Sequence, residues 1–265
     1  ELPLLVKFID AEKDLSIQVH PDDTMAQREH GKRGKSEMWY VISAQPGAYL
    51  YAGFKEHITP YEYKRRVEDG SITEVLARHE VRAGDVFYLP AGRVHAICGG
   101  ILLAEVQQSS DVTYRIFDYN RPGMDGRPRQ LHTELAAQAL DYTVESEYRT
   151  QYALRENGAS LVVDTPHFTV RVNEVYRPIH RDLIKYDSFV ISMCMQGSCR
   201  IRLRSNGAEV PLQAGQTCFI PAAVADYDIL PDEDKGLCRI LDAFIDNMDR
   251  SLLSSVSRFL HLTRK

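Results

Sequence analysis

Polar and apolar residues alternate along much of the chain, and this alternation predicts β-strands. Successive side chains of a strand point to opposite faces, so residues 15–20 place Ser16, Gln18 and His20 on one face and aliphatic residues on the other. Residues 37–42 form a second apolar run that begins with a glutamate. The pattern predicts a mainly β protein.

Helical spacing of apolar residues interrupts the strands. Thr59 is followed by proline, which is typical of an N-cap and first helical position, and it predicts a helix over 59–68. A second short helix is expected over 71–78, so that residues 59–78 form a helical insertion between strands. Two further helices are expected, one at 133–140 and an amphipathic C-terminal helix at 246–262.

The second half of the chain repeats the pattern of the first. A polar segment at 141–158 is interpreted as a linker, after which period-two patterning returns. Residues 214–226 align with residues 83–95 without gaps, which indicates an internal repeat. The alignment places Asp226 at the position of His95, and the second unit has no Gln-x-His motif. We therefore expect a metal-binding unit at 1–140 and a second unit without a metal site at 159–265, which includes the C-terminal helix.

Composition excludes several classes of protein. A chain of 265 residues that is 44% apolar can bury a sizeable core. Its net charge of -5 and pI near 6.0 argue against a nucleic-acid-binding protein. No apolar run is long enough to span a membrane, and no signal peptide is recognised. The five cysteines form no C-x-x-C pair and are interpreted as free thiols of a reducing compartment, so a cytoplasmic protein is expected.

Three residues from separate strand-like segments form a candidate metal site. His20 and Glu37 lie in the segments described above, and His95 follows a strand and a turn with proline and glycine. Two imidazoles and a carboxylate are ligands that zinc or iron accepts. Gln18 shares the face of His20 and is a candidate fourth ligand. Six other histidines are interpreted as surface or core residues: His30, His57, His79, His167, His180 and His261.

Several motifs in order resemble a type I mannose-6-phosphate isomerase of the short bacterial form. They cover about the first 140 residues and are, in order, Gln-Val-His-Pro at 18–21, Gly-Lys-Ser-Glu-Met-Trp-Tyr at 34–40, the segment 90–97, Glu-Val-Gln-Gln-Ser-Ser-Asp-Val-Thr-Tyr-Arg at 105–115, and Asp-Tyr-Asn-Arg at 118–121. From the internal repeat we interpret the fold as two barrels of the cupin, or jelly-roll, type, the first with the metal site and the second without one. The resemblance implies one divalent ion, expected to be Zn²⁺, and a sugar phosphate as substrate. The chain begins at Glu1 and not at a methionine, and we expect it to be part of a longer protein, since members of the family carry an N-terminal segment that adds strands to the fold.

The reaction implied by the resemblance interconverts mannose 6-phosphate and fructose 6-phosphate through an enediolate. The resemblance places the catalytic arginine at Arg115, where its charge would stabilise the enediolate. Glu105, in an apolar stretch, is a candidate base because burial raises a carboxyl pKa. Alternatively, Glu105 is a structural partner of Arg115. In that case His20 or a metal-bound hydroxide could be the base.

Basic residues are expected at the phosphate end of the substrate. Lys35 and Arg121 match positions that the family keeps basic, and Ser16 is a possible hydroxyl donor. Arg121 also lies in a turn pattern, which gives it a structural alternative.

Two other functions remain open from the residues alone. Two histidines and a carboxylate also describe the iron(II) site of a cupin dioxygenase. A sugar-binding cupin with a structural metal is the third possibility, and it would lack a base beside an open coordination position.

Overall fold

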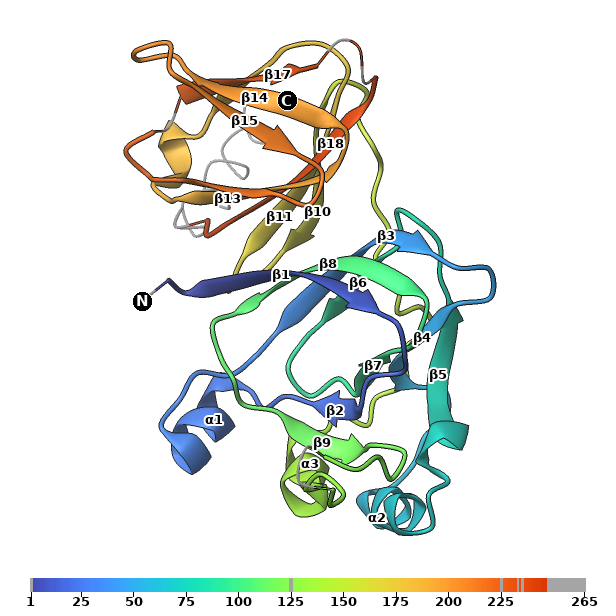
Figure 1. Ribbon diagram of the computed structural model, residues 1–265. Coiled ribbons are helices and arrows are strands. Elements are labelled where there is room, and N and C mark those ends of the chain that lie inside the picture. The colour runs from blue at the N-terminus through green and yellow to red at the C-terminus, as the bar shows by residue number, and fades with distance from the viewer. Residues whose placement is uncertain (1, 124–125, 225, 233, 235, 247–265) are drawn as a thin grey trace, which may run out of the picture. The chain divides into compact units, whose positions relative to one another are not determined.

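Antiparallel strands form most of the protein in the computed structural model, which describes residues 2–123, 126–224, 226–232, 234 and 236–246. The chain divides into two compact units, Glu1–Tyr152 and Ala153–Lys265. Each unit contains two antiparallel sheets (Figure 1). The mainly β class predicted from the alternation is confirmed.

The first unit packs two sheets against each other. One has the order β1 (Leu4–Ala11), β8 (Ile101–Gln108), β3 (Glu37–Ala44), β6 (Val86–Leu89), and the other has the order β5 (Leu76–Glu80), β4 (Tyr49–Phe54), β7 (His95–Ile97), β2 (Ile17–Val19), β9 (Tyr114–Phe117). Trp39 and Leu103 of the first sheet share a buried core with Leu50 and Ile97 of the second. The inner faces of the two sheets therefore enclose an interior.

Helices cover the outer face of the second sheet. Helix α2 (Pro60–Glu68), the 3-10 turn η1 (Ile72–Val75) and helix α3 (Thr133–Ala139) lie on this side of the first unit (Figure 1). Their buried residues share a core with Ile17 and Val19 of β2 and with Ala96 of β7. Since side chains alternate along a strand, Gln18 and His95 point to the interior. The helices thus fix which residues of these strands face inward.

The helical insertion is only partly as expected. The predicted helix at 59–68 is confirmed, because Thr59 and Glu62 form a reciprocal capping box before α2. The predicted helix at 71–78 is wrong: one 3-10 turn is followed by β5, in which Leu76 pairs with Phe54 of β4. Residues 76–80 form the edge strand of the sheet instead, and their hydrogen bonds to β4 outweigh the helical spacing of the apolar residues.

Helix α1 was not predicted from the sequence. It spans Asp23–His30, and the Asp22 side chain accepts a hydrogen bond from Met25 N at 2.7 Å. Gly31 ends the helix in the left-handed conformation, with φ of 64°. An Asp N-cap and a Gly C-cap were the available signals, but the helix is too short for clear periodicity.

The second unit repeats the strand order of the first. The orders β1-β8-β3-β6 and β5-β4-β7-β2 recur as β11-β18-β13-β16 and β15-β14-β17-β12, with β10 added at one edge. The bounds are β10 Gly158–Asp164, β11 Thr169–Val175, β12 Ile179–Asp182, β13 Val190–Gln196, β14 Ser198–Leu203, β15 Glu209–Gln213, β16 Thr217–Ile220, β17 Asp226–Pro231 and β18 Cys238–Phe244; a 3-10 turn, η2, spans Ile184–Tyr186. The internal repeat is therefore present in the topology.

Strand pairing corrects one position of the repeat. His95 pairs with Gln18 on β2 and with Ala52 on β4, whereas in β17 it is Tyr227 that makes the corresponding pairs, with Arg181 and Leu203. Tyr227 is buried and Asp226 is exposed. The position of His95 is thus taken by Tyr227 and not by Asp226, because the preceding turn is one residue longer.

The boundary between the units falls at Tyr152, inside the segment 141–158 that was expected as a linker. Tyr148 belongs to the core of the first unit, and its hydroxyl donates to Phe54 O at 2.8 Å. The helix expected at 246–262, with His261, lies outside the described residues apart from Asp246.

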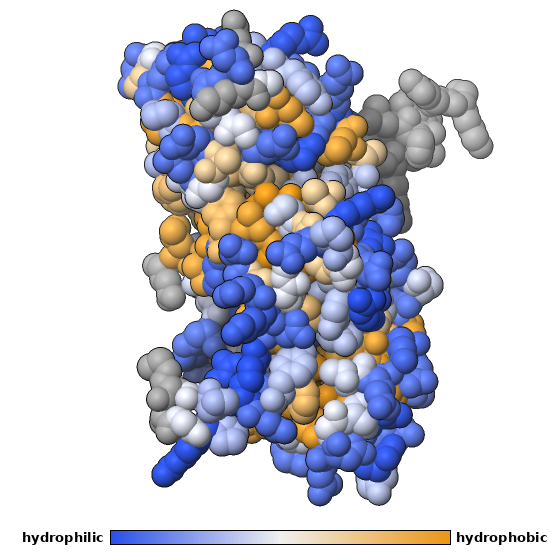
Figure 2. Space-filling model, turned by 45° about the vertical axis from the view of Figure 1, so that its right-hand side comes forward, coloured by the Kyte–Doolittle hydropathy of each residue, from blue (hydrophilic) through white to orange (hydrophobic). Residues whose placement is uncertain are grey.

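The described part of the chain holds no helix that is long and apolar enough to cross a bilayer. Hydrophilic colours cover most of the face seen in Figure 2, with hydrophobic patches between them.

Gly53 lies at an irregularity in the pairing of β4 and has φ of +79°. A Cβ atom at this position would lie 2.1 Å from Cε1 of Tyr148, whereas one at Gly47, with φ of +78°, would contact nothing within 4 Å. The two glycines share a backbone conformation and differ in the space around them.

We therefore expect Gly53→Ala to destabilise the protein more than Gly47→Ala. Urea unfolding should show a loss of about 1 kcal/mol for Gly47→Ala, from the left-handed conformation alone, and of about 2 to 4 kcal/mol for Gly53→Ala, where overpacking is added. Equal losses in the two variants would contradict the packing of Tyr148 on β4.

Candidate metal centre

His20, Glu37 and His95 converge in the interior of the first unit. Glu37 begins β3, His95 begins β7 and His20 follows β2, and all three are at most 2% exposed. One ligand atom from each lies within 4.8 Å of the others. His20 Nε2 is 3.2 Å from Glu37 Oε1, and His95 Nε2 is 3.6 Å from Glu37 Oε2. Residues far apart in sequence thus present donor atoms to one point.

Backbone carbonyls orient both imidazoles. His20 Nδ1 donates to Val112 O at 3.0 Å, and His95 Nδ1 donates to Arg93 O at 2.8 Å. A carbonyl can only accept, so each ring carries its proton on Nδ1 and turns the lone pair of Nε2 toward the centre. Such a second contact is usual for metal-binding histidines.

Three of the atoms at the centre lack hydrogen bonds. His20 Nε2 and both carboxylate oxygens of Glu37 are buried without a hydrogen-bond partner among the described residues. Lys35 Nζ lies 2.9 Å from Glu37 Oε1, but without the angles of a hydrogen bond. Buried polar atoms without partners are costly. The set fits a divalent cation, which would satisfy all of them together.

Gln18 borders the same point. It pairs with His95 across β2 and β7, and its amide nitrogen lies 3.3 Å from His95 Nε2. Rotation of the amide by half a turn would present its oxygen to the centre.

The protonation states suit metal binding. Burial raises the pKa of Glu37, but His20, Lys35 and His95 outweigh it and hold the pKa well below its usual range. Burial lowers the pKa of His95 to about 3 against the opposing effect of Glu37. At neutral pH the site therefore offers an ionised carboxylate and a neutral imidazole.

Glu105 lies beside this centre with partners other than Arg115. It pairs across the sheet with Trp39 and with Lys7, and accepts hydrogen bonds from Trp39 Nε1 at 2.9 Å and Lys7 Nζ at 2.6 Å. Lys7 Nζ also donates to Gln107 Oε1 at 2.6 Å. Burial and the neighbouring Glu37 raise the pKa of Glu105, and Lys7 opposes them.

Lys7 and Gln107 were not predicted as site residues. Alternation along a strand shows which residues of that strand share a face. Only the register between β1 and β8 shows that Lys7 lies beside Glu105 and Gln107.

Arg115 faces the interior next to Gln18. The two residues pair between β2 and β9. Arg115 Nη1 donates to Gln130 O at 3.0 Å, and its Nε is buried without a partner within the described chain. Arg115 therefore lies in the same row of inward residues as Gln18 and His95.

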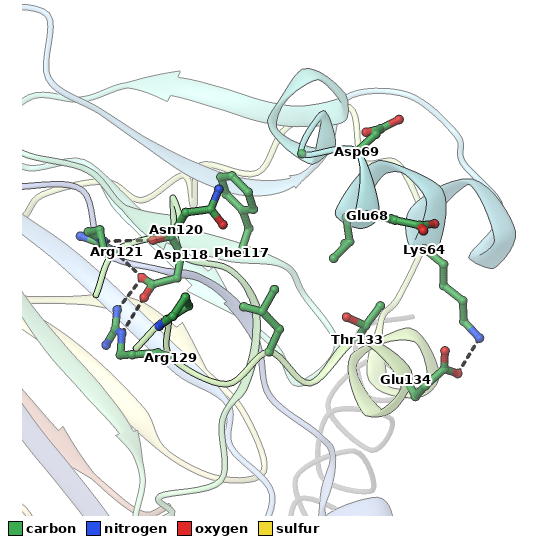
Figure 3. Close-up of a pocket in the computed structure, with 14 residues that line it drawn as sticks. Lys64, Glu68, Asp69, Phe117, Asp118, Asn120, Arg121, Arg129, Thr133 and Glu134 are labelled. Carbon is green, nitrogen blue, oxygen red and sulfur yellow. Dashed lines mark hydrogen bonds and ion pairs between the residues drawn. The ribbon is translucent and has the colours of Figure 1, made fainter. Parts of the chain in front are cut away.

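Arg121 is held by neighbouring oxygen atoms. Its guanidinium donates to Asp118 Oδ1 at 2.6 Å and to Asp14 O, and Arg129 holds the other side of the Asp118 carboxylate. These groups line one side of a surface pocket of about 690 Å³, with the ion pair of Lys64 and Glu134 on the other (Figure 3).

Acidic and basic side chains balance closely in this pocket, so it is not a strong anion site. The geometry thus favours the structural alternative for Arg121 over a role in phosphate binding. Ser16 is buried one residue before β2.

The second unit has no such donors at the equivalent positions. Strand pairing places Val190 where the first unit has Glu37, since these residues pair with Ile220 and Leu89. Arg181 takes the position of Gln18, and its Nη2 lies 3.6 Å from Asp242 Oδ2. In the described residues, the three ligands of the first unit form the one cluster suited to a metal.

Comparisons with known proteins agree with this geometry. A family model described as the catalytic domain of type I phosphomannose isomerase matches residues 1–42. The probable mannose-6-phosphate isomerase GmuF of Bacillus subtilis is 34% identical over 242 residues, which are 90% of this chain and 74% of that protein. The mannose-6-phosphate isomerase ManA of Bacillus subtilis is 44% identical over 140 residues, 52% of this chain and 44% of that protein.

A crystal structure of a mannose 6-phosphate isomerase from Bacillus subtilis is similar in fold, with a TM-score of 0.81 and 30% identity. The match covers 92% of this chain and 75% of that one. Both units are therefore included in the similarity.

We expect Lys7→Met to make stability more dependent on pH. A carboxyl whose pKa is raised on folding contributes stability that is lost as the pH rises, and removal of Lys7 raises the pKa of Glu105 further. The loss in free energy of unfolding should be about 1 to 3 kcal/mol near pH 8 and smaller near pH 5.

Lys32→Met is the matched control, because Lys32 pairs with the exposed Asp111. Its effect should be small and the same at both pH values. A pH-independent loss in Lys7→Met would show that Lys7 does not set the ionisation of Glu105.

Proposed function

This chain belongs to the type I mannose-6-phosphate isomerase family, and on that basis we propose that it interconverts mannose 6-phosphate and fructose 6-phosphate. The observation that carries the proposal is the convergence of His20, Glu37 and His95 on one buried point with their donor atoms unsatisfied. Relatives at this level of identity are named as enzymes of this reaction.

We propose that these three residues hold one Zn²⁺ ion and that Gln18 is a weaker fourth ligand. A bound divalent ion supplies Lewis-acid stabilisation of negative charge on the substrate oxygens without a change of oxidation state. The nitrogen and carboxylate donors suit zinc.

Arg115 is proposed to stabilise charge that develops in the reaction. Isomerisation removes a weakly acidic proton next to a carbonyl and returns it to the neighbouring carbon, and the enediolate between these steps is high in energy. A guanidinium fixed on the interior face beside Gln18 lowers that energy because it is in place before the charge appears.

Glu105 is proposed to carry the proton between the two carbons. Lys7 and Trp39 each hold one of its oxygens, so the carboxylate is fixed in orientation. Burial raises its pKa toward the range in which a carboxyl group can both take and return a proton.

Lys35 is proposed to bind the anionic substrate. Its ammonium group is buried and neutralises Glu37 in the structure. When a cation takes up the charge of Glu37, the ammonium becomes available to phosphate or another anionic oxygen. A buried ammonium group in this position favours an anionic sugar over the substrate of a dioxygenase or a neutral sugar ligand.

Removal of the metal should abolish isomerisation. We expect the purified protein to contain about one zinc ion per chain, and a chelator to reduce turnover on mannose 6-phosphate by at least about a hundredfold, reversible with Zn²⁺. Elemental analysis and a coupled assay for fructose 6-phosphate measure both. Full metal loading without isomerisation would overturn the proposed function.

Arg115→Ala and Lys35→Ala should affect different kinetic constants. Arg115 acts on charge present only in the transition state, so Arg115→Ala should lower kcat by about two to three orders of magnitude with little change in KM. Lys35 binds the ground state as well, so Lys35→Ala should mainly raise KM. Metal content is measured for each variant, and unchanged kcat in metal-loaded Arg115→Ala would remove the role given to Arg115.

A further inference from the structure

Arg115 lies on an edge strand. β9 is the last strand of its sheet and pairs with β2 on one side only. A residue in an edge strand presents its N–H and C=O groups away from the sheet at alternate positions, and these groups need other partners. The backbone of Arg115 is therefore not fixed by strand pairing alone.

His132 supplies both missing partners. The Arg115 N–H donates to Nδ1 of the His132 ring at 3.1 Å, and the His132 N–H donates to Arg115 O at 2.8 Å. His132 thus makes two hydrogen bonds with the free edge of β9. Its ring nitrogen accepts the bond that a carbonyl of a neighbouring strand would accept within a sheet.

His132 is itself anchored by helix α3. It is the N-cap residue, and Ala136 N donates to His132 O at 2.8 Å. Ala136 is fully buried in the core that includes the outer face of the sheet. N-cap residues commonly use their side chain to cap the helix, but His132 makes no such bond. Its ring serves Arg115 instead.

The ring can accept this hydrogen bond only when Nδ1 is unprotonated. Burial lowers the pKa of His132, and the neighbouring Arg115 and His30 lower it further. The ring also faces Tyr114, at 6.1 Å between centroids, whose hydroxyl lies 2.9 Å from His30 Nε2. The neutral form of His132 is thus favoured by its surroundings.

The same segment holds one end of the Arg115 side chain. Gln130 O accepts from Nη1 at 3.0 Å, whereas Nε has no partner among the residues described. Residues 130–132 therefore fix the backbone and one guanidinium nitrogen of Arg115 and leave other donors for a ligand.

We propose that His132 is a positioning residue for Arg115: its neutral ring, anchored at the start of α3, fixes the strand so that the guanidinium meets the substrate in the orientation that catalysis needs. This inference rests on the proposed isomerase function and adds a residue that the sequence did not indicate. His132 need not contact the substrate.

The test compares His132→Leu with His132→Asn. Leucine keeps bulk and removes the acceptor, so kcat on mannose 6-phosphate should fall by about ten- to a hundredfold, with KM changed less than about threefold. Asparagine offers an amide oxygen near the position of Nδ1 and is a favoured N-cap, so it should restore kcat to within about threefold of the original protein.

His30→Gln is the matched control. His30 contacts Tyr114 in the same region but makes no bond to Arg115, and the variant should keep kcat unchanged. Metal content and thermal unfolding are measured for all variants, so that loss of the ion or of the fold is recognised.

A double-mutant cycle decides whether His132 acts through Arg115. In an Arg115→Ala background, His132→Leu should lower kcat by less than about twofold, because the group it positions is gone. An undiminished effect in that background, or full kcat in His132→Leu alone, would overturn the proposal while the isomerase function stands. Failure of the original metal-loaded protein to isomerise mannose 6-phosphate would instead overturn the function on which it rests.

Discussion

The first unit is organised around one buried negative charge. Glu37 is 1% exposed yet ionised, and an uncompensated buried carboxylate would cost several kcal/mol. His20, His95 and Lys35 converge on it from neighbouring segments. Backbone carbonyls orient the two imidazoles, and the helices behind the second sheet fix which strand residues face inward. The polar side chains around Glu37 are thus arranged to compensate its charge.

The second unit shows the same topology without that constraint. Valine occupies the position of Glu37, and the polar groups that remain inside, Asp242 and Arg181, neutralise each other. Asp242 also accepts hydrogen bonds from Ser192 at 2.6 Å and Asn173 at 2.8 Å. Asp242 pairs with Ser192 as Glu105 pairs with Trp39, so Asp242 is the counterpart of Glu105 and not of Glu37. Each of these two acids has a basic side-chain partner, Lys7 in the first unit and Arg181 in the second.

Local alternation placed Gln18 and His20 on one polar face of a short strand, and the motifs that resemble the family were needed to complete the candidate set with Glu37 and His95. Contacts between strands were not predictable in this way. Lys7 meets Glu105 only through the register of β1 and β8, and His132 meets Arg115 only because β9 is an edge. The ungapped repeat failed at Asp226 for a similar reason, since one extra residue in a turn reverses which side chain faces inward.

The pairing of β1 with β8 also bears on how the protein is made. Lys7 and Glu105 are separated by 98 residues, and closing a loop of that length is slow compared with forming a local turn. The interior cannot close until the chain beyond β8 has been synthesised, and His95 is incorporated only shortly before. A growing chain on the ribosome therefore carries Glu37 for a long interval before His95 can reach it, and the site proposed for the ion is completed only at a late stage of folding of this unit.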